Sequence, residues 1–165
     1  MTDSYDMALV RVDNRLVHGQ ILEAWVPFIK AQCIIVVNDS VAGDFYRETV
    51  IRLAVPSDIE VIVSSVEEFT RTYNFSREAG KKTIVLLGSV ADALRAYNCG
   101  FRFDKLNIGN IYNEEYQVCS APSVFLCAAD INHISELLTE KGVAIEIRRI
   151  PRERAVNIKD IIKKF

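Results

Sequence analysis

Short runs of β-branched and aliphatic residues alternate along the chain with longer segments in which apolar residues recur at helical spacing. The apolar runs predict strands at Ala8–Val12, Cys33–Asn38, Ile59–Ser64, Thr83–Gly88, Lys105–Gly109, Ser123–Leu126 and Val143–Ile150. Several are apolar at successive positions, as in Ile34–Val37, which is typical of strands covered by helices on both faces. The alternation therefore predicts an α/β fold with a mainly parallel open sheet and helices on both faces.

The run Val143–Ile150 differs from the others because isoleucines alternate in it with glutamate and arginine. Such alternation indicates a strand that is buried on one face only, and charged side chains protect a sheet edge from pairing with another chain. We therefore expect this strand at an edge of the sheet, which is also where one strand can run antiparallel to the rest.

Serines mark predicted helix starts. Ser65 and Ser89 directly follow predicted strands, and an acidic residue comes three positions after each of them, Glu68 and Asp92 respectively. This spacing is the pattern of a capping box at a helix N-terminus. Glycines mark the predicted helix ends, at Gly80, Gly100 and Gly142.

Length and charge narrow the classes of protein to consider. The chain has 165 residues, about one domain's worth, so we treat 1–165 as a single domain. Twenty Lys and Arg against 22 Asp and Glu give a formal net charge of −2. This balance provides no basic field for nucleic acid, so any phosphate binding must be local.

No segment has the pattern of a signal peptide or a membrane span. The residues Met1–Met7 carry two aspartates, and the longest charge-free stretch, Tyr116–Ala129, falls short of the ~20 apolar residues that cross a bilayer. We expect a cytoplasmic protein, at most peripherally associated with a membrane transporter. Because the cysteines form no C-x-x-C pair and only two histidines accompany them, we expect no metal, no disulfide scaffold and no cofactor.

The polar loop after the first predicted strand, Asp13–Gln20, contains the most distinctive candidate site. In open α/β sheets, ligands collect at the carboxyl ends of the strands. His18, one of two histidines in the chain, lies in this loop at the expected start of a helix. Neutral imidazole is nucleophilic near physiological pH and can hold a phosphoryl group covalently. The position therefore indicates a histidine that carries phosphate.

Four neighbours of His18 fit this chemistry. Arg15 supplies a guanidinium that can contact two phosphate oxygens. Gly19 and Gln20 lie at the helix start, where backbone N–H groups and the helix dipole favour an anion. Asp13 can hydrogen-bond the imidazole and fix its tautomer. Arg15, Gly19 and Gln20 are thus the predicted phosphate-binding residues, and Asp13 is the predicted orienting residue.

A loop histidine can also be an exposed residue without any chemistry. His133 is interpreted in this way, because it lies near the start of another predicted helix with no basic residue in the preceding stretch. The sequence contains neither a Walker loop nor a G-x-G-x-x-G motif, so phosphate chemistry here has no evident nucleotide cradle.

The segment Val10–Gln20, with the sequence VRVDNRLVHGQ, resembles the signature of the IIB components of the mannose/fructose/sorbose family. These proteins belong to the bacterial phosphoenolpyruvate-dependent sugar phosphotransferase system. The resemblance covers nearly the whole chain, through the further segments Ile34–Asp39, Ser64–Glu67, Asn107–Gly109 and Gly142–Arg148. The histidine motif is its specific part.

In that family, IIB accepts a phosphoryl group on its loop histidine from a histidine of the IIA protein. It then donates the group to a sugar that is delivered through the membrane components IIC and IID. The resemblance implies that His18 is the carrier in an enzyme of this transferase class, with Arg15 and Asp13 as its phosphate-binding and orienting neighbours. It also implies helices on both faces of the sheet and a homodimer.

The chain departs from the family pattern in two places. Family members often carry aspartate where this chain has Asn14. After the fifth strand they commonly have paired glycines and then a basic residue, whereas Asn110–Glu115 contains Glu114 and Glu115. Two carboxylates there would repel a phosphoryl group or change the surface offered to a partner.

Two other functions remain open on the sequence. The altered segment Asn110–Glu115 would suit a regulatory phosphorelay protein that uses His18 without moving sugar, and IIC and IID genes beside this one would argue against that function. A protein of the same architecture could also bind a small anion without accepting phosphate, with His18 as an ordinary hydrogen-bonding group.

Overall fold

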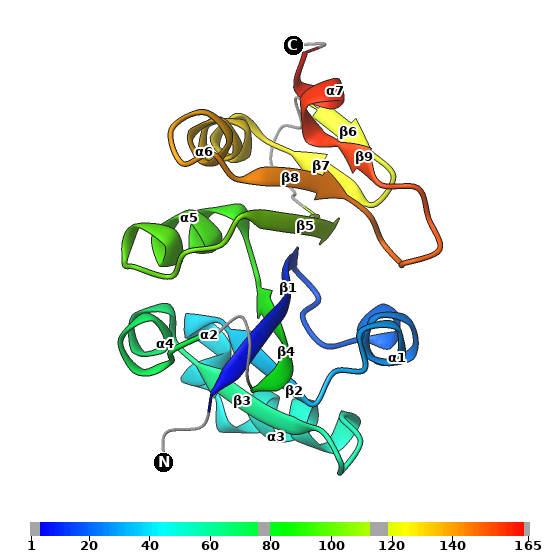
Figure 1. Ribbon diagram of the computed structural model, residues 1–165, viewed down its shortest axis with the longest axis vertical. Helices are drawn as coiled ribbons and strands as arrows, with labels where there is room; N and C mark the ends of the chain where they lie inside the picture. Colours follow the sequence, from blue (N-terminus) through cyan, green and yellow to red (C-terminus); the bar gives the residue numbers. More distant parts are fainter. Residues whose placement is uncertain (1–3, 76–79, 113–118, 164–165) are drawn as a thin grey trace.

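Figure 1 shows a computed structural model of the chain, which describes residues 4–75, 80–112 and 119–163. Its main sheet has the strand order β3-β2-β4-β1-β5-β8-β9. The strands of this sheet are β1 (Tyr5–Asp13), β2 (Cys33–Val37), β3 (Glu60–Ser64), β4 (Lys81–Leu87), β5 (Lys105–Asn110), β8 (Ala144–Ile147) and β9 (Val156–Asn157). All neighbouring pairs are parallel except β8 and β9, so the predicted mainly parallel α/β sheet is confirmed.

Helices cover both faces of this sheet, as the sequence predicts; Figure 1 shows α4, α5 and α6 on one side of β1 and α1 on the other. The helical segments are the π-helix η1 (Gln20–Trp25), α1 (Val26–Ile29), α2 (Asp39–Ala42), α3 (Phe45–Ala54), α4 (Val66–Thr72), α5 (Val90–Asn98), α6 (Ala128–Thr139) and α7 (Ile158–Ile162). The α4–α7 core contains Phe69, Leu137 and Ile158. The α1–α3 core, on the opposite face, contains Trp25 and Val41.

The interior strands β2 and β4 are buried on both faces along Cys33–Val37 and Thr83–Leu87. Ile34 and Ile84 pack into the α1–α3 core, and Ile35 and Val85 pack into the α4–α7 core, all with 0% exposure. Burial on both faces explains why these strands are apolar at successive positions rather than at every second one.

The predicted strand Ser123–Leu126 is not part of the main sheet. It forms β7 (Val124–Leu126), which pairs antiparallel with β6 (Cys119–Ala121) in a separate two-stranded sheet. The connection consists of Pro122 and Ser123, and Ser123 has a φ of 66°. A connection of two residues makes β7 antiparallel to β6. The contact of β7 with the chain after β5 is an isolated parallel bridge between Val124 and Ile111.

The edge of the sheet also differs from the prediction for Val143–Ile150. The β8 part of this run is parallel to β5, and β9 pairs with its other side through Glu146 and Ile147. The edge strand is therefore β9, which is antiparallel as expected of an edge but lies after the predicted run. The chain turns back through Pro151 to reach it.

The two predicted serine caps are present. The Oγ atom of Ser65 accepts a hydrogen bond from the N–H of Glu68 at 3.1 Å, at the start of α4. The Oγ atom of Ser89 accepts one from the N–H of Asp92 at 3.1 Å, at the start of α5. Each cap satisfies a backbone donor that the first helical turn leaves without an intrahelical partner.

Gly100 and Gly142 follow α5 and α6 as predicted, but Gly80 does not end α4, which stops at Thr72. Gly80 instead lies against the backbone before β1. A Cβ atom at this position would lie 2.3 Å from the carbonyl oxygen of Ser4. Its φ of 145° and this close approach explain the glycine.

Candidate active site

The chain reverses direction directly after β1, in a tight turn from Asp13 to Leu16. The N–H of Leu16 donates to the carbonyl oxygen of Asp13 at 3.0 Å, and the N–H of Arg15 donates to Oδ1 of Asp13 at 3.0 Å. Leu16 has a φ of 58°, an unusual conformation for a leucine, and its side chain is buried in the α1–α3 core. This turn brings His18 back to the carboxyl end of β1.

The imidazole of His18 contacts the carboxylate of Asp13. The distance from Nε2 of His18 to Oδ2 of Asp13 is 2.7 Å. An ionised carboxylate can only accept hydrogen bonds, so Nε2 carries a proton, and in the neutral form of the ring the lone pair is on Nδ1. The His18 side chain is 14% exposed, whereas that of Asp13 is fully buried. The ring is therefore held from inside the protein and reachable from outside.

Asp13 is held by several donors at once. The Nδ2 atom of Asn110 lies 2.8 Å from Oδ2 of Asp13, and Nη2 of Arg11 lies 3.0 Å from the same oxygen. Burial raises the pKa of the Asp13 carboxyl, but the hydrogen bonds from His18 and Asn110 and the charge of Arg11 outweigh burial. The pKa consequently lies below its ordinary value of 3.8. Asp13 is thus an anion at neutral pH.

Arg11 connects the site to distant parts of the chain. Its side chain is fully buried in β1, and besides Asp13 it donates to Oδ1 of Asn107 at 2.6 Å, to the carbonyl oxygen of Arg148 at 2.9 Å and to Oε1 of Gln20 at 3.2 Å. Burial lowers the pKa of Arg11, and the charge of Asp13 opposes this effect. A buried guanidinium with this many partners fixes the position of Asp13.

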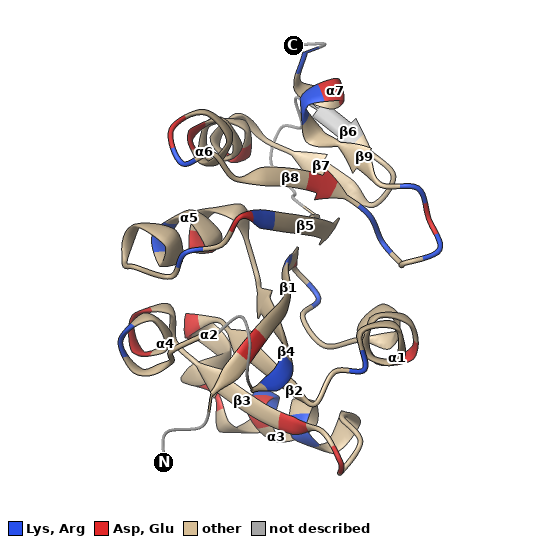
Figure 2. Ribbon diagram, in the orientation of Figure 1, with Lys and Arg blue, Asp and Glu red and all other residues tan. Residues whose placement is uncertain are grey.

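The loop between β8 and β9 closes over this network. The indole Nε1 of Trp25 donates to the carbonyl oxygen of Arg149 at 2.8 Å. The guanidinium carbons of Arg11 and Arg148 lie 5.6 and 5.7 Å from the centre of the Trp25 ring, within the range of a cation–π contact. Figure 2 shows basic and acidic residues along this loop. Glu153 forms an ion pair with Arg149 at 2.5 Å.

The structure brings only some of the predicted residues together. Gln20 joins the network, because its Oε1 accepts from Nδ2 of Asn110 at 3.0 Å as well as from Arg11. Arg15 is exposed, and its side chain makes no hydrogen bond or ion pair within the described residues. Gly19 is exposed as well, and a Cβ atom there would approach only Oε2 of Glu23, at 4.0 Å.

Three residues of the network were not predicted as site residues: Arg11, Asn107 and Asn110. A signal for Arg11 exists in the sequence, since it is a charged residue inside an otherwise apolar run. The two asparagines come from β5, next to β1 in the sheet. Their polar character at the end of a buried strand is visible in the sequence, but which partner they contact depends on the strand order.

Two further interpretations of the sequence concern His133 and the pair Glu114 and Glu115. His133, interpreted as a surface residue, is half-buried on α6, and its Nδ1 atom has no hydrogen-bond partner within the described residues. Glu114 and Glu115, which carry the departure from the family pattern, lie outside the described residues.

Within the described ranges, no group of three or more His, Cys, Asp or Glu side chains is placed to hold a metal ion. No helix found in the same ranges combines the length and apolar character needed to cross a bilayer.

The fold and this loop together define an α/β protein with a carboxylate-bound histidine at the carboxyl end of its first strand. The family described as "PTS system sorbose subfamily IIB component" matches residues 7–165. The chain therefore belongs to the sorbose-subfamily IIB components of the phosphotransferase system, which confirms the resemblance seen in the sequence. As a IIB component, it is a transferase component of a sugar phosphotransferase system.

Individual relatives agree with this assignment. The chain is 29% identical over 158 residues to the PTS system fructose-specific EIIB component of Bacillus subtilis (strain 168), with 96% of each chain covered. It is 31% identical over 158 residues to the PTS system sorbose-specific EIIB component of Klebsiella pneumoniae, again with 96% of each covered. It also matches the mannose-specific EIIAB component of Escherichia coli (strain K12) at 27% identity, over 49% of that longer protein.

The fold is also similar to that of a solved structure of a sorbose IIB domain. The crystal structure of the IIBSor domain of the sorbose permease from Klebsiella pneumoniae superposes with a TM-score of 0.86. The two chains are 31% identical, and the match covers 96% of this chain and 97% of that one.

Proposed function

We propose that this protein is a phosphocarrier that accepts a phosphoryl group on His18 from a histidine of a IIA protein. It then donates the group to a sugar taken up through a IIC/IID membrane complex. The observation that carries the proposal is the 2.7 Å contact between Nε2 of His18 and the buried carboxylate of Asp13. Membership of the IIB family supports the same activity.

The contact selects Nδ1 as the atom that accepts phosphorus. With the Nε2 proton held by Asp13, the lone pair of Nδ1 attacks phosphorus, the P–N bond to the donor histidine breaks, and the donor ring keeps the electron pair. Attack leaves a positive charge on the His18 ring. Asp13 stabilises this charge through the hydrogen bond that already exists, so no rearrangement is needed at the moment of transfer.

The remaining predicted residues receive distinct roles in this proposal. Arg15 is exposed and has no partner within the described residues, so its guanidinium is available to contact phosphate oxygens. Gly19 leaves open the space where a side chain would begin, which gives the phosphoryl group room to approach the backbone. The Oε1 atom of Gln20 is occupied by Arg11 and Asn110, which leaves its amide nitrogen for the phosphoryl group.

Labelling separates the two histidines of the chain. The wild type and the variants His18→Ala and His133→Ala are incubated with phosphoenolpyruvate, the general phosphotransferase proteins and IIA. Mass spectrometry that preserves acid-labile phosphoramidates then measures the bound phosphate. We expect label on the wild type and on His133→Ala and none on His18→Ala; label on His18→Ala would exclude His18 as the acceptor. Nitrogen–phosphorus couplings in 15N NMR identify Nδ1.

The second half-reaction needs its own measurement, because a regulatory phosphorelay protein would also become labelled. The phosphorylated protein is mixed with membrane vesicles that contain IIC and IID and with radioactive sorbose, fructose or mannose. We expect sugar phosphate to form as the label on His18 disappears. Stable label in the presence of every sugar would favour the regulatory function over sugar transfer.

A further inference from the structure

Strands β1 and β5 separate toward their N-terminal ends. They are paired from Arg11 to Asp13 only, although β1 begins at Tyr5. At Tyr5, one edge of β1 is paired with β4. The opposite edge is paired with Phe75 through an isolated parallel bridge. Between these two contacts, no strand among the described residues is paired with the β5-facing edge of Asp6–Val10. This leaves five residues of open strand edge inside the sheet.

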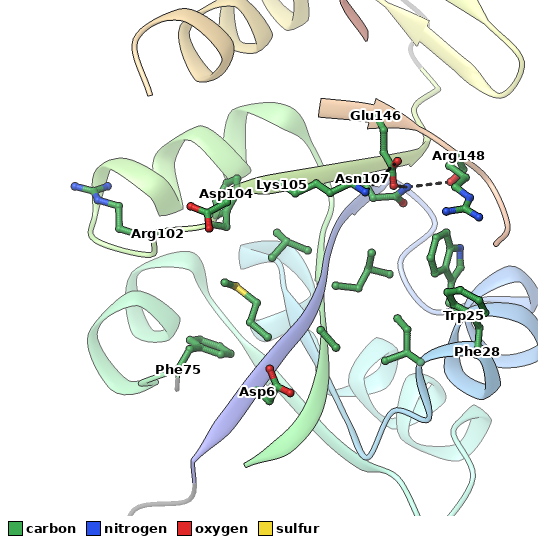
Figure 3. Close-up of a pocket in the computed structure, with 16 residues that line it drawn as sticks. Asp6, Trp25, Phe28, Phe75, Arg102, Asp104, Lys105, Asn107, Glu146 and Arg148 are labelled. Carbon is green, nitrogen blue, oxygen red and sulfur yellow. Dashed lines mark hydrogen bonds and ion pairs between the residues drawn. The ribbon is translucent and has the colours of Figure 1, made fainter. Parts of the chain in front are cut away.

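A cavity of about 710 Å³ opens at this edge. Figure 3 shows β1 crossing it, with Arg102, Asp104 and Lys105 on the β5 side. The cavity is lined by all five residues Asp6–Val10. Its size is that of a site for a ligand of substantial size rather than for single water molecules.

The cavity passes through the plane of the sheet. Of its lining residues, Met7 and Phe103 belong to the α4–α7 core, whereas Leu9, Trp25 and Ile29 belong to the α1–α3 core. Figure 3 likewise places Phe75 and Trp25 at opposite ends of the cavity. An occupant would therefore meet apolar walls on both faces of the sheet.

Several charged groups around the cavity are already engaged within the protein. Nζ of Lys105 lies 3.2 Å from Oε2 of Glu146. The Arg102 guanidinium lies 4.4 Å from the centre of the Tyr97 ring, and Nε of Arg148 donates to a carbonyl oxygen of the loop after β8 at 2.9 Å. The carboxylates of Asp6 and Asp104 also line the cavity. Besides these two carboxylates, the cavity offers an occupant mainly apolar side chains and the main chain of the β1 edge.

We propose that the cavity binds an extended apolar segment of a partner protein, which pairs through its main chain with the Asp6–Val10 edge of β1. A strand added to an open edge is recognised by backbone hydrogen bonds and by pockets for its side chains. Successive side chains of such a segment point to opposite faces of the sheet. Since both faces are apolar here, successive residues of the segment must be apolar too.

The partner is a different protein rather than a second copy of this chain. The only runs of four successive aliphatic residues in this chain are Ile34–Val37 and Ile84–Leu87, and both are fully buried in β2 and β4, each between two neighbouring strands. They cannot leave the sheet to enter a neighbour's cavity without unfolding it. The proposed segment therefore comes from a chain that exposes such a sequence.

The chain contains a single tryptophan, and Trp25 lines the cavity, so its fluorescence reports on the occupant. The probe is the blocked peptide acetyl-Lys-Val-Ile-Val-Ile-Val-Lys-amide, in which the lysines provide solubility. We expect saturable binding that changes the Trp25 signal, together with amide hydrogen-exchange protection confined to Asp6–Val10 and the first residues of β5. Absence of binding at millimolar peptide would overturn the proposal.

Two kinds of control test whether the main chain is recognised. The peptide is N-methylated at alternate residues in either of the two registers, which removes donors from one side of the strand at a time. We expect one register to lose binding by about tenfold or more and the other to retain it. Equal binding by both methylated peptides would show adsorption to an apolar surface and would contradict strand pairing.

The matched protein variants are Phe28→Ser and Phe45→Ser. Phe28 lines the cavity and is 64% exposed, and Phe45 is 84% exposed on α3 and does not line it. Neither substitution opens the core, and equal thermal melting temperatures verify this. We expect Phe28→Ser to weaken peptide binding about tenfold, as loss of one aromatic anchor does, and Phe45→Ser to leave it unchanged. Equal effects would place the peptide elsewhere.

Two further outcomes would assign the cavity to another occupant and reject the proposal. If rising protein concentration alone protects Asp6–Val10 while gel filtration shows a dimer, the occupant is a second copy. The second outcome is that the peptide does not bind, whereas the small aromatic anion 1-anilinonaphthalene-8-sulfonate changes the Trp25 fluorescence and protects the amides of Asp6–Val10 from exchange. The cavity would then be a small-molecule site.

Discussion

The guanidinium of Arg11 fills the space that a side chain at Gly109 would occupy. A Cβ atom on Gly109 would lie 1.8 Å from Nη2 of Arg11 and 2.0 Å from its Cζ. The pairing of β1 with β5 steps over this glycine, since Val12 is opposite Ile108 and Asp13 is opposite Asn110. The absent side chain is thus what allows a buried arginine beneath Asp13.

We expect Gly109→Ala to lower the free energy of unfolding by about 3–5 kcal/mol, because it displaces Arg11 and leaves the buried charge of Asp13 without its partner. The control is Gly43→Ala, because a Cβ atom at residue 43 would come no closer than 3.7 Å to any neighbour. Urea unfolding measures both. In the background of Arg11→Ala, the added methyl group of Gly109→Ala enters vacated space, so its effect should be much smaller. If the effects of Gly109→Ala and Arg11→Ala on the free energy of unfolding were additive, the two side chains would not compete for the same space.

The hydrogen bond from His18 to Asp13 makes a prediction about rate. Asp13→Asn keeps the size of the side chain but removes the charge that stabilises the phosphorylated ring. A hydrogen bond to a charged group contributes about 1.5–3 kcal/mol, so we expect transfer from IIA to slow by about ten- to a hundredfold. Rapid-quench labelling measures the rate, and Asp58→Asn, which changes an exposed carboxylate, is the control. An unchanged rate for Asp13→Asn would remove Asp13 from the mechanism.

Arg15 should affect transfer without affecting stability. Its side chain is exposed and makes no hydrogen bond or ion pair within the described part of the chain, so Arg15→Ala should change the free energy of unfolding by less than about 0.5 kcal/mol. Arg15→Lys keeps the charge but loses the two-pronged contact with phosphate, and we expect slower transfer from IIA in both variants. Arg47→Lys, on the exposed side of α3, provides the control. Full activity of Arg15→Ala would show that another group binds the phosphate.

The lowered pKa of Asp13 predicts how stability depends on pH. Because the carboxylate titrates below 3.8 in the folded protein, its ionised form stabilises the fold at higher pH, and this contribution is lost as pH falls below about 3.8. In that range the loss from this group approaches about 1.4 kcal/mol per pH unit. We expect Asp13→Asn to be less stable at pH 7 and to lack this part of the acid dependence, as measured by urea unfolding at pH 2.5 to 7.

The pKa of Asp92 is shifted in the opposite direction to that of Asp13, so Asp92 serves as a comparison. Burial is the main cause that raises the pKa of its carboxyl above 3.8, so its ionised form opposes folding, and this effect appears as pH rises through that range. Asp92→Asn should therefore not reproduce the loss of stability at pH 7. Identical pH profiles for the two variants would contradict the assignment of the acid dependence to Asp13.

The buried strands and the two serine-capped helices could be predicted from the sequence because burial and capping leave local patterns, whereas α2, α3, β6 and β9 were not predicted. The runs around Ile34 and Ile84 are apolar at successive positions since both faces are covered, and Ser65 and Ser89 cap helices through contacts only three residues away. The hairpin of β6 and β7 could not be separated from the sheet in this way. A strand of three residues has the same local pattern whichever strand it pairs with.

In the candidate site, too, contacts between residues close in the sequence could be predicted, and contacts between distant residues could not. Asp13 and His18 are five residues apart, so their contact could be predicted from one loop. Arg11 was missed because its partner Asn107 is 96 residues away and its partner Arg148 is 137 residues away. These contacts exist only once the order of the strands is known. Long-range pairing, rather than residue type, is what the sequence analysis lacked.

The hydrogen bond from Arg11 to the carbonyl oxygen of Arg148 has a consequence for biosynthesis. At a translation rate of about 5–20 residues per second, ribosomes need roughly 7 to 26 seconds to extend the chain from His18 to Arg148. Throughout that interval the histidine is present, but the support beneath its carboxylate partner is incomplete. A growing polypeptide should therefore be a poor phosphate acceptor until Arg148 has left the exit tunnel, so that unfinished molecules do not drain phosphate from the relay.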